Sequence, residues 1–258
     1  MSSTPTPGPV TVRGTTIGTG RPKVIVPLTA RTPDELVAQA AAVLDAAPDV
    51  VEWRIDHLLA GGSSTPAVVD AGRRLLAALG GLPVLATIRT AAEGGEQALT
   101  DTEYVAVYRA VLDAGLADLV DVEVMREAGT VQELVDLAHA GDVAVVASNH
   151  DFDATPPQAE IERRLLLMAE RGADVLKIAV MPRDPGDVLT LLAATWAVSQ
   201  RTEHPLITMS MAGTGVVSRL AGGVFGSAAT FGMVGRASAP GQVDVGALRA
   251  VLALVHQD

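Results

Sequence analysis

Short apolar runs alternate with longer amphipathic stretches along this chain. Eight of the short runs are rich in Val, Ile and Ala, which is typical of buried β-strands. They begin at Lys23, Val50, Pro83, Leu119, Val143, Val175, Pro205 and Ser227. Because helical patterns lie between these runs, the sequence predicts strands that pair in parallel.

Most of the helical stretches begin with a capping residue, followed by proline or by an acidic first turn. Such start signals occur at Thr32–Pro33, Thr65–Pro66, Thr100 with Glu103, Thr155–Pro156 and Asp184–Pro185, and a closing helix begins near Val243. Eight strands that alternate with helices predict a (β/α)8 barrel, or TIM barrel, of the α/β class. A doubly wound sheet is the second choice, because P-L-T-A-R-T follows the first strand in place of a glycine-rich dinucleotide-binding turn.

The N-terminal residues are expected to lie outside the barrel wall. Residues 1–9 lack a basic region followed by an apolar core, so they predict a disordered tail and not a signal peptide. The segment from Val10 to Gly18 alternates and turns at Gly14, as a short β-hairpin does. We therefore expect one barrel domain over residues 10–258, with a hairpin cap at 10–18.

Composition and charge narrow the classes of protein. The hydrophobic fraction is 48% and aromatic residues make up 3%, so Ala, Val, Leu and Ile build the core, as in parallel sheets covered by helices. The lack of cysteine excludes disulfides, thiol nucleophiles and thiolate metal sites. A net charge of −11 argues against a nucleic-acid or membrane partner, but an anionic small-molecule substrate still suits a basic cleft. No apolar run is long enough to span a bilayer, and we expect a cytoplasmic location.

Unexpected polar residues gather where the predicted strands end. In a (β/α)8 barrel the catalytic groups lie at the C-terminal ends of the strands. The polar residues in or just after the predicted strands are Glu52, Arg54, Arg89, Glu93, Glu123, His150, Lys177, Arg219, Ser238 and Gln242. Because unrelated surface charges would not select one end of a barrel, this convergence predicts a functional site.

Taken singly, several of these residues also have structural explanations. Glu52 and Arg54 alternate on one side of a strand, which equally suits an ion pair inside the barrel. His150 precedes Asp151 and suits a helix cap, and Arg219 on a short helix suits a solvated surface charge. The sequence alone leaves these alternatives open.

Lys177 is the most unusual polar residue, because it interrupts the apolar run D-V-L-K-I-A-V-M-P. A buried lysine is rare and is explained by a charged end that reaches water, by an ion pair or by a reactive amine. We expect the apolar neighbours Val175, Ile178 and Val180 to disfavour the ammonium form. A neutral amine attacks a ketone or aldehyde to form an imine.

A proton carrier and an anion-binding group would complete this chemistry. We place His150 at the barrel mouth as the carrier, with His57 as second choice and with Glu93 or Glu123 orienting the imidazole. The arginines suit a substrate carboxylate, which a guanidinium binds through two parallel hydrogen bonds. The residues therefore predict Schiff-base chemistry on an anionic carbonyl compound. Neither His-x-His nor HExxH spacing occurs, so we expect no metal site.

Seven segments carry a more specific signal. They are E-W-R-I-D-H, T-I-R-T-A-A-E-G-G-E, S-N-H-D-F, K-I-A-V-M-P, T-M-S-M, S-R-L-A-G-G-V-F-G-S-A-A-T-F and S-A-P-G-Q. In this order they resemble the type I 3-dehydroquinate dehydratases of the shikimate pathway of aromatic amino acid biosynthesis, over nearly the whole chain. The resemblance implies a (β/α)8 fold, hydro-lyase activity on 3-dehydroquinate, a homodimer, and neither a metal nor an organic cofactor.

The resemblance also implies roles for single residues. Lys177 would form the imine with the C3 ketone of 3-dehydroquinate. His150 would remove a C2 proton and protonate the departing C1 hydroxyl, giving syn elimination to 3-dehydroshikimate, with Glu93 as its partner. The substrate would be held by Glu52, Arg54, Arg89 and Arg219, the last on the carboxylate, with Ser238 and Gln242 closing over it.

One position departs from the family pattern. The first strand of family members often ends with a serine near the substrate, and Pro27 stands here instead. Proline offers neither a hydroxyl nor an amide proton, so we expect one substrate hydrogen bond to be absent or to come from Thr29, a loss of about 0.5–1.5 kcal/mol. Two other functions remain open. One is a class I aldolase-like barrel with a sugar-phosphate site between Gly213 and Gly226, and the other is a non-catalytic binding barrel.

Overall fold

The computed structural model describes residues 8–235 and 238–256. The described chain opens with an antiparallel hairpin of β1 (Val10–Val12) and β2 (Thr15–Ile17). Arg13 and Gly14, with φ of 45° and 83°, form its turn, where a left-handed backbone favours glycine. The predicted hairpin is confirmed, and most of the predicted tail, residues 1–7, lies outside the described residues.

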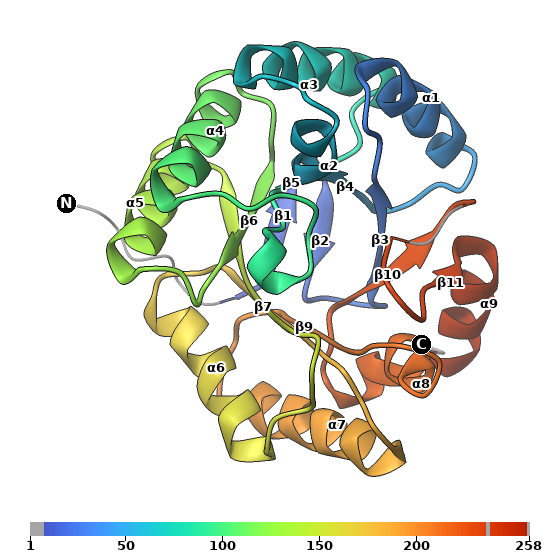
Figure 1. Cartoon of the computed structure of the whole chain (residues 1–258). Coiled ribbons are helices and arrows are strands. Elements are labelled where there is room, and N and C mark those ends of the chain that lie inside the picture. Colours follow the sequence, from blue (N-terminus) through green and yellow to red (C-terminus); the bar gives the residue numbers. More distant parts are fainter. Residues whose placement is uncertain (1–7, 236–237, 257–258) are drawn as a thin grey trace.

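Eight parallel strands close into a barrel (Figure 1). From β3 to β9 each strand pairs with the next, β10 pairs with β3, and a bridge between Leu206 and Ser227 joins β9 to the start of β10. The two-residue strand β11 (Val243–Asp244) pairs with the end of β10. The predicted (β/α)8 barrel is therefore confirmed. Its strands are β3 (Lys23–Leu28), β4 (Val50–Arg54), β5 (Val84–Thr87), β6 (Leu119–Glu123), β7 (Ala144–Asp151), β8 (Val175–Val180), β9 (Leu206–Ser210) and β10 (Ala229–Met233).

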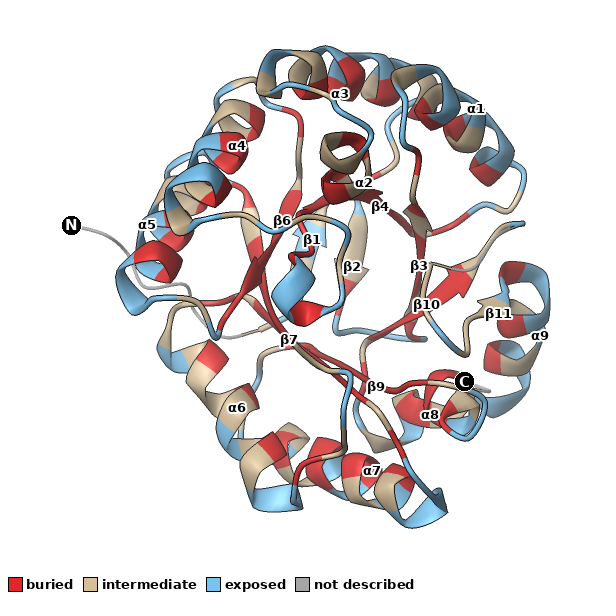
Figure 2. Ribbon diagram, in the orientation of Figure 1, coloured by how far each residue is buried: buried red, intermediate tan, exposed pale blue. Residues whose placement is uncertain are grey.

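Helices surround the barrel, and their buried residues face the strands (Figure 2). Three predicted start signals are confirmed, because the side chains of Thr32, Thr100 and Asp184 accept first-turn amides of α1, α4 and α7. None of the described helices is both long and apolar enough to cross a membrane. The helices are α1 (Pro33–Leu44), α2 (Ile55–Ala60), α3 (Thr65–Leu79), α4 (Asp101–Asp113), α5 (Ala128–Ala140), α6 (Gln158–Glu170), α7 (Pro185–Ser199), α8 (Val216–Ala221) and α9 (Val245–Val255), with 3₁₀ turns η1 (Ala91–Glu93) and η2 (Gly222–Phe225).

The start of α6 differs from the prediction. The helix begins at Gln158 and not at the Thr155–Pro156 signal. The Thr155 hydroxyl instead donates to the Met181 carbonyl (3.0 Å), which ties this loop to the end of β8. The capping side chain is therefore used to hold a loop at the barrel mouth.

Two apolar layers, separated by the barrel wall, form the core. Side chains alternate between the two faces of each strand. Those that point outward, among them Trp53 and Ile178, pack against the helices. Those that point inward, such as Val50 and Val175, fill the barrel, and Ile17 of the hairpin packs against them at the N-terminal ends of the strands. This leaves the C-terminal ends as the place where inward-facing positions are polar.

Candidate active site

One cavity at the C-terminal mouth of the barrel brings the predicted site residues together. It contains about 530 Å³ of space that no atom fills, part of which is open to solvent. All nine residues predicted for the site line it: Glu52, Arg54, Arg89, Glu93, His150, Lys177, Arg219, Ser238 and Gln242. The rest of the lining is mostly apolar and comes from Gly94, Phe152, Ala179, Met209, Met211, Phe231 and Ala239.

Lys177 of β8 points into this cavity and is 3% exposed. Its Nζ lies 2.8 Å from Asp121 Oδ2 and 3.5 Å from Glu52 Oε1, and 4.6 Å from the centre of the Phe231 ring. The amine is therefore not in the apolar surroundings that the sequence predicted.

The strand geometry explains this difference. Val175 lies on the inner face of the barrel with Lys177, but Ile178 and Val180 pack outward against the helices. Residues adjacent in a strand point to opposite faces, so direct neighbours in sequence cannot surround the same amine. Carboxylates from other strands surround it instead.

Asp121 of β6 is the site residue that the sequence reading missed. It is fully buried and accepts hydrogen bonds from Lys177, from Arg89 Nη2 (2.6 Å) and from the Ser148 hydroxyl (2.5 Å). Burial acts to raise the pKa of Asp121, but the Arg89 and Lys177 charges outweigh burial and hold that pKa well below its usual range. Its signal in the sequence was the alternation D-V-E, in which Asp121 shares the face of Glu123.

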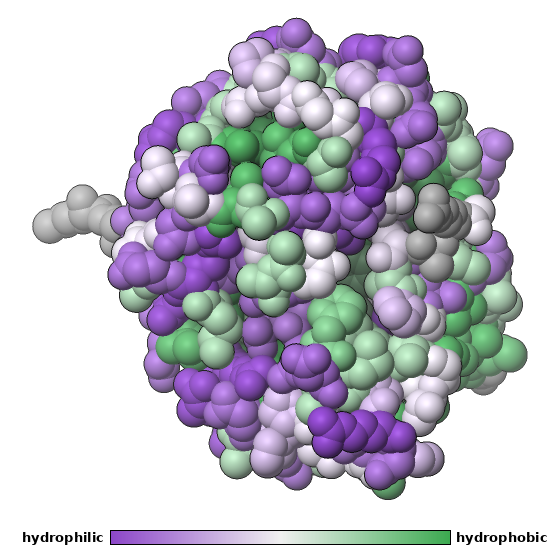
Figure 3. Space-filling view, in the orientation of Figure 1, coloured by the Kyte–Doolittle hydropathy of each residue, from purple (hydrophilic) through white to green (hydrophobic). Residues whose placement is uncertain are grey.

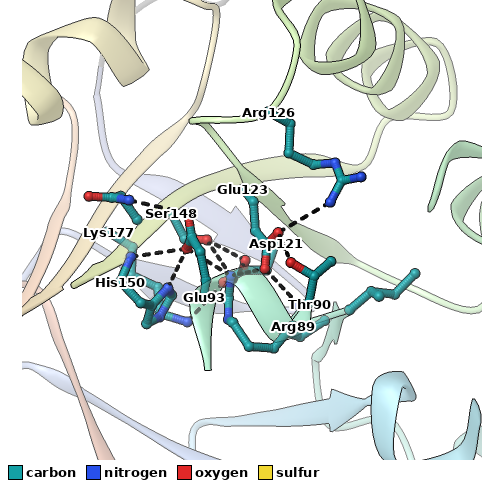
Figure 4. Close-up of polar contacts among 12 residues, drawn as sticks. Arg89, Thr90, Glu93, Asp121, Glu123, Arg126, Ser148, His150 and Lys177 are labelled. Atoms are coloured by element: carbon teal, nitrogen blue, oxygen red, sulfur yellow. Dashed lines mark hydrogen bonds and ion pairs between the residues drawn. The ribbon is translucent and has the colours of Figure 1, made fainter. Parts of the chain in front are cut away.

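Arg89 joins the carboxylates on this side of the barrel, and Figure 4 shows them converging on it. Besides Asp121, its guanidinium donates to Ser148 (3.0 Å) and Glu123 (3.1 Å) and lies 3.5 Å from Glu93. Glu123 also accepts the Thr90 amide (2.8 Å) and hydroxyl (2.7 Å). Because these donors occupy Glu123, it does not serve as the partner of the histidine.

Glu93 is that partner. Its Oε2 lies 2.9 Å from His150 Nδ1 and accepts the His150 amide (3.0 Å), while its Oε1 accepts the Asn149 amide group (3.1 Å). A tight turn fixes Glu93, since η1 ends at Gly94 with φ of 79°, a conformation that favours glycine.

Burial has opposite effects on the two members of this pair. It raises the pKa of Glu93 to about 7. It lowers the pKa of His150 well below the usual value, and the nearby charges of Arg89 and Lys177 lower it further. His150 is therefore neutral, and an ionised Glu93 places its hydrogen on Nδ1 and leaves Nε2 with a free lone pair. The second-choice histidine, His57, lies 3.9 Å from Asp56 and is not part of the cavity lining in the described chain.

Glu52 and Arg54 share the cavity without contacting each other as an ion pair. Arg54 binds both carboxylate oxygens of Asp56 (2.8 and 2.7 Å), and Glu52 accepts the Thr87 hydroxyl (3.1 Å) beside Lys177. The alternative of an ion pair between these two residues inside the barrel is therefore wrong.

Arg219 of α8 is buried at 2% exposure, so the alternative of a solvated surface charge is wrong. Within the described chain its guanidinium meets the Met209 sulfur (3.5 Å) and the Pro240 carbonyl (3.2 Å) but no carboxylate, and its Nε has no partner. Burial lowers the pKa of Arg219 to about 10. A buried cation without an anion is costly, so this geometry suits an anionic ligand.

Ser238 and Gln242 form the side of the cavity that follows β10. The Ser238 amide donates to Gln242 Oε1 (2.8 Å), and the Gln242 amide group donates to the Ser238 hydroxyl (3.0 Å). The Ala212 amide donates to the Pro240 carbonyl (3.2 Å), which anchors this loop beside Arg219. Both side chains are half-buried and face one another across the loop.

Pro27 lies away from this lining. Pro27 and Thr29 line a separate cavity with Gln39 and Val234, and in the described chain neither lines the cavity that holds Lys177. The Thr29 amide donates to Gln39 (2.9 Å), so this amide is already satisfied. The pairing of β3 with β10 ends at Ile25, and Pro27 therefore lies beyond the last residue pair of that ladder.

Known proteins are similar to this chain in both fold and sequence. The family model of type I 3-dehydroquinase matches residues 24–258. The 3-dehydroquinate dehydratase of Salmonella agona is 49% identical over 249 residues, 96% of this chain and 98% of the relative. The crystal structure of the type I 3-dehydroquinate dehydratase of Clostridium difficile with covalent modified comenic acid superposes with a TM-score of 0.93 at 40% identity, covering 97% of this chain and 99% of that one. The enzyme of Geobacillus kaustophilus superposes with a TM-score of 0.92 at 34% identity, covering 96% of each chain. This chain therefore belongs to the type I 3-dehydroquinase family.

Proposed function

We propose that this protein catalyses the dehydration of 3-dehydroquinate to 3-dehydroshikimate through a Schiff base on Lys177. The observation that carries the proposal is a single cavity holding a buried lysine amine, a neutral histidine and a buried guanidinium without a carboxylate partner. An amine, a base and an anion site are what elimination from a carboxylated ketone requires. The relatives named 3-dehydroquinate dehydratase support this substrate.

In the bound complex, the substrate carboxylate pairs with Arg219, whose guanidinium then gains the anion that it lacks. Glu52 and Arg54 bind the ring hydroxyls from one side of the cavity, and Ser238 with Gln242 covers the other side. Arg89 lines the cavity too, but most of its donors are used by Asp121, Glu123 and Ser148. We therefore assign Arg89 mainly to the fixing of Asp121 and secondarily to the substrate.

The reaction begins when Lys177 loses a proton and its Nζ attacks C3 of the substrate. The resulting carbinolamine loses water to give a protonated imine, which draws electrons from the C2–H bond. Asp121 and Glu52 stay beside the nitrogen, and their negative charge stabilises the ammonium and the iminium forms alike.

His150 then moves the protons. Its free Nε2 takes the C2 proton and returns it to the C1 hydroxyl, which leaves as water, while Glu93 stabilises the positive imidazole. Hydrolysis of the imine consumes one water and restores Lys177. Imine formation and elimination each release one water and imine hydrolysis consumes one, so the net reaction releases one water.

A direct assay tests the proposal. 3-Dehydroshikimate contains a conjugated enone, so its formation raises ultraviolet absorbance when 3-dehydroquinate is mixed with the protein. The aldolase-like alternative predicts that the absorbance does not rise and that inorganic phosphate inhibits the protein. Our proposal predicts inhibition by shikimate-like carboxylates. A protein that binds 3-dehydroquinate without any absorbance change would fit the non-catalytic alternative.

We also propose that two copies assemble into a homodimer. Large apolar side chains are exposed on Leu189 and Trp196 of α7, Val224 of η2 and Leu254 of α9, and hydrophobic residues gather over α9 at the right edge of Figure 3. α7 packs against η2, and α8 packs against η2 and α9, so these residues lie on adjoining elements. Exposed apolar surface of this kind suits a subunit contact. Sedimentation should give a dimer mass for the wild type and a monomer for Trp196→Glu, and an unchanged mass would place the contact elsewhere.

A further inference from the structure

A series of hydrogen-bonded side chains holds Glu93 and leads away from the cavity. Its Oε1 accepts from the Asn149 amide group (3.1 Å), and the Asn149 carbonyl oxygen accepts in turn from Arg164 Nη1 (2.9 Å). Arg164 comes from α6 and is itself fixed by Glu160 (2.8 Å) and Asp151 (3.3 Å). In the described chain neither Asn149 nor Arg164 lines the cavity that holds Lys177, but Asn149 lines a neighbouring cavity with Glu93 and His150.

The donors and acceptors of these groups determine which end of the Asn149 amide faces each neighbour. A guanidinium can only donate hydrogen bonds, so the oxygen of the Asn149 amide must face Arg164. The NH2 end must then face Glu93. Asn149 is 5% exposed, so its side-chain partners, more than bulk solvent, orient the amide. Without Arg164 the amide is free to turn its oxygen toward the Glu93 carboxylate, which would repel it.

We propose that Arg164 and Asn149 are positioning residues that hold Glu93 as the ionised acceptor of the His150 Nδ1 hydrogen. This inference rests on the proposed function, in which His150 must present a free Nε2 to the substrate. The Asn149 hydrogen bond stabilises the ionised form of Glu93 more than the neutral form, and two neighbouring carboxylates oppose ionisation. The charged groups that face Glu93 are Arg89, Asp121 and Glu123 from the β5 and β6 ends and Lys177 of β8, and the titratable neutral group is His150 of β7.

The test is the pH profile of kcat/KM for three variants. Asn149→Leu removes the amide at similar volume, so Glu93 becomes harder to ionise and the acidic limb of the profile moves to higher pH. We expect kcat/KM to fall about tenfold at pH 6 and less than about threefold at pH 9, the size of one hydrogen bond to a charged group. Arg164→Met should move the limb in the same direction by less. A role in folding alone would lower the profile equally at every pH.

The double variant tests whether Arg164 acts through Asn149. With the amide gone, Arg164→Met has nothing left to orient, so N149L/R164M should match N149L. The matched control is Arg163→Met, at the preceding residue of α6, which contacts Glu160 and not Asn149. That variant should keep the wild-type profile.

Two results would overturn the inference: profiles of Asn149→Leu and Arg164→Met that run parallel to the wild type, or effects that add in the double variant. If Asn149→Leu does not fold, Arg164→Met alone decides, because the Arg164 side chain is partly exposed (17%) and its loss disturbs the core less. Borohydride reduction with substrate separates this inference from the proposed function. An adduct on Lys177 with unshifted profiles rejects the positioning role alone, whereas no adduct in the wild type rejects the Schiff-base mechanism.

Discussion

The two ends of the barrel use charged residues in different ways. At the N-terminal end, an aspartate stands directly before β4, β6 and β8, and each accepts an amide at the start of the preceding strand. Each of these aspartates also meets one cation from elsewhere in the chain. The pairs are Asp49 with Arg249 (3.4 Å), Asp118 with Arg13 (2.7 Å) and Asp174 with His139 (2.9 Å), on the amides of Val24, Val84 and Val145.

At the C-terminal end several charges are not matched one to one, although Arg54 pairs with Asp56. Asp121 meets two cations, Arg89 meets three carboxylates and Arg219 meets none in the described chain. A charge that has one opposite partner stabilises the fold and needs no further partner. A shared or unmatched charge can still gain a favourable interaction when a ligand binds. The comparison therefore separates aspartates that hold strands together from residues that act on a substrate.

The largest expected effect comes from Lys177→Met. This change removes the nucleophile and leaves the rest of the cavity in place, so turnover should fall about 10⁴-fold or more. The matched control is Lys23→Met at the opposite end of the barrel, where Lys23 Nζ donates to the Thr19 and Arg21 carbonyls. The control should keep wild-type turnover in the ultraviolet assay. Turnover by Lys177→Met within tenfold of the wild type would remove the distinction between the two ends.

The next effect is at Arg219, where a substitution should weaken substrate binding and stabilise the fold. Arg219→Met removes the unmatched cation, so kcat/KM should fall about 10²- to 10³-fold, mostly through KM. The free energy of unfolding should rise by about 1–2 kcal/mol, because a buried charge without a partner is lost. Arg201→Met, which breaks an exposed ion pair with Glu162 (2.9 Å), should change both quantities little. Lower stability with unchanged KM would show that Arg219 is structural.

A smaller effect concerns the pH dependence. Burial raises the pKa of Glu93 to about 7, and the ionised carboxylate accepts the His150 Nδ1 hydrogen more strongly than the neutral acid does. We therefore expect kcat/KM to rise as the pH rises through about 7, with an apparent value that belongs to the Glu93–His150 pair. Glu93→Gln should lower kcat/KM about tenfold to hundredfold and abolish that limb. A limb that persists at the same pH in Glu93→Gln must arise from another group.

The smallest effect lies at the N-terminal end. The hydrogen bond from Asp174 raises the pKa of His139, so the pair stabilises the fold below the unfolded value of about 6.5 and stops doing so as the pH rises through the raised pKa. His139→Gln should thus lower the free energy of unfolding by about 1 kcal/mol at pH 5.5 and by less at pH 9. Urea unfolding at the two pH values measures this difference. Turnover of the folded variant should equal that of the wild type. A large loss of turnover would show that the N-terminal end also contributes to activity.

The sequence predicted the barrel well because its strands and helix caps are local patterns. The alternation of strands and helices along the sequence also placed Glu52, Lys177 and His150 at the C-terminal end of the barrel. It could not show which residues from different strands meet, and so Asp121 was missed and the amine was placed among apolar neighbours. A similar long-range contact is the hydroxyl of Tyr108, which accepts the Ile88 amide (2.9 Å) and donates to the Asp121 carbonyl. Such bridges depend on how α4 packs, which no local pattern encodes.

We expect Lys177 to form a covalent imine with the substrate, and the chain is well suited to a direct test. It contains two lysines, Lys177 in the cavity and Lys23 at the far end of the barrel. Borohydride reduction in the presence of 3-dehydroquinate, followed by peptide mass spectrometry, should find the added mass on the Lys177 peptide and an unmodified Lys23 peptide. An unmodified Lys177 peptide in an enzyme that still turns over its substrate would contradict the account.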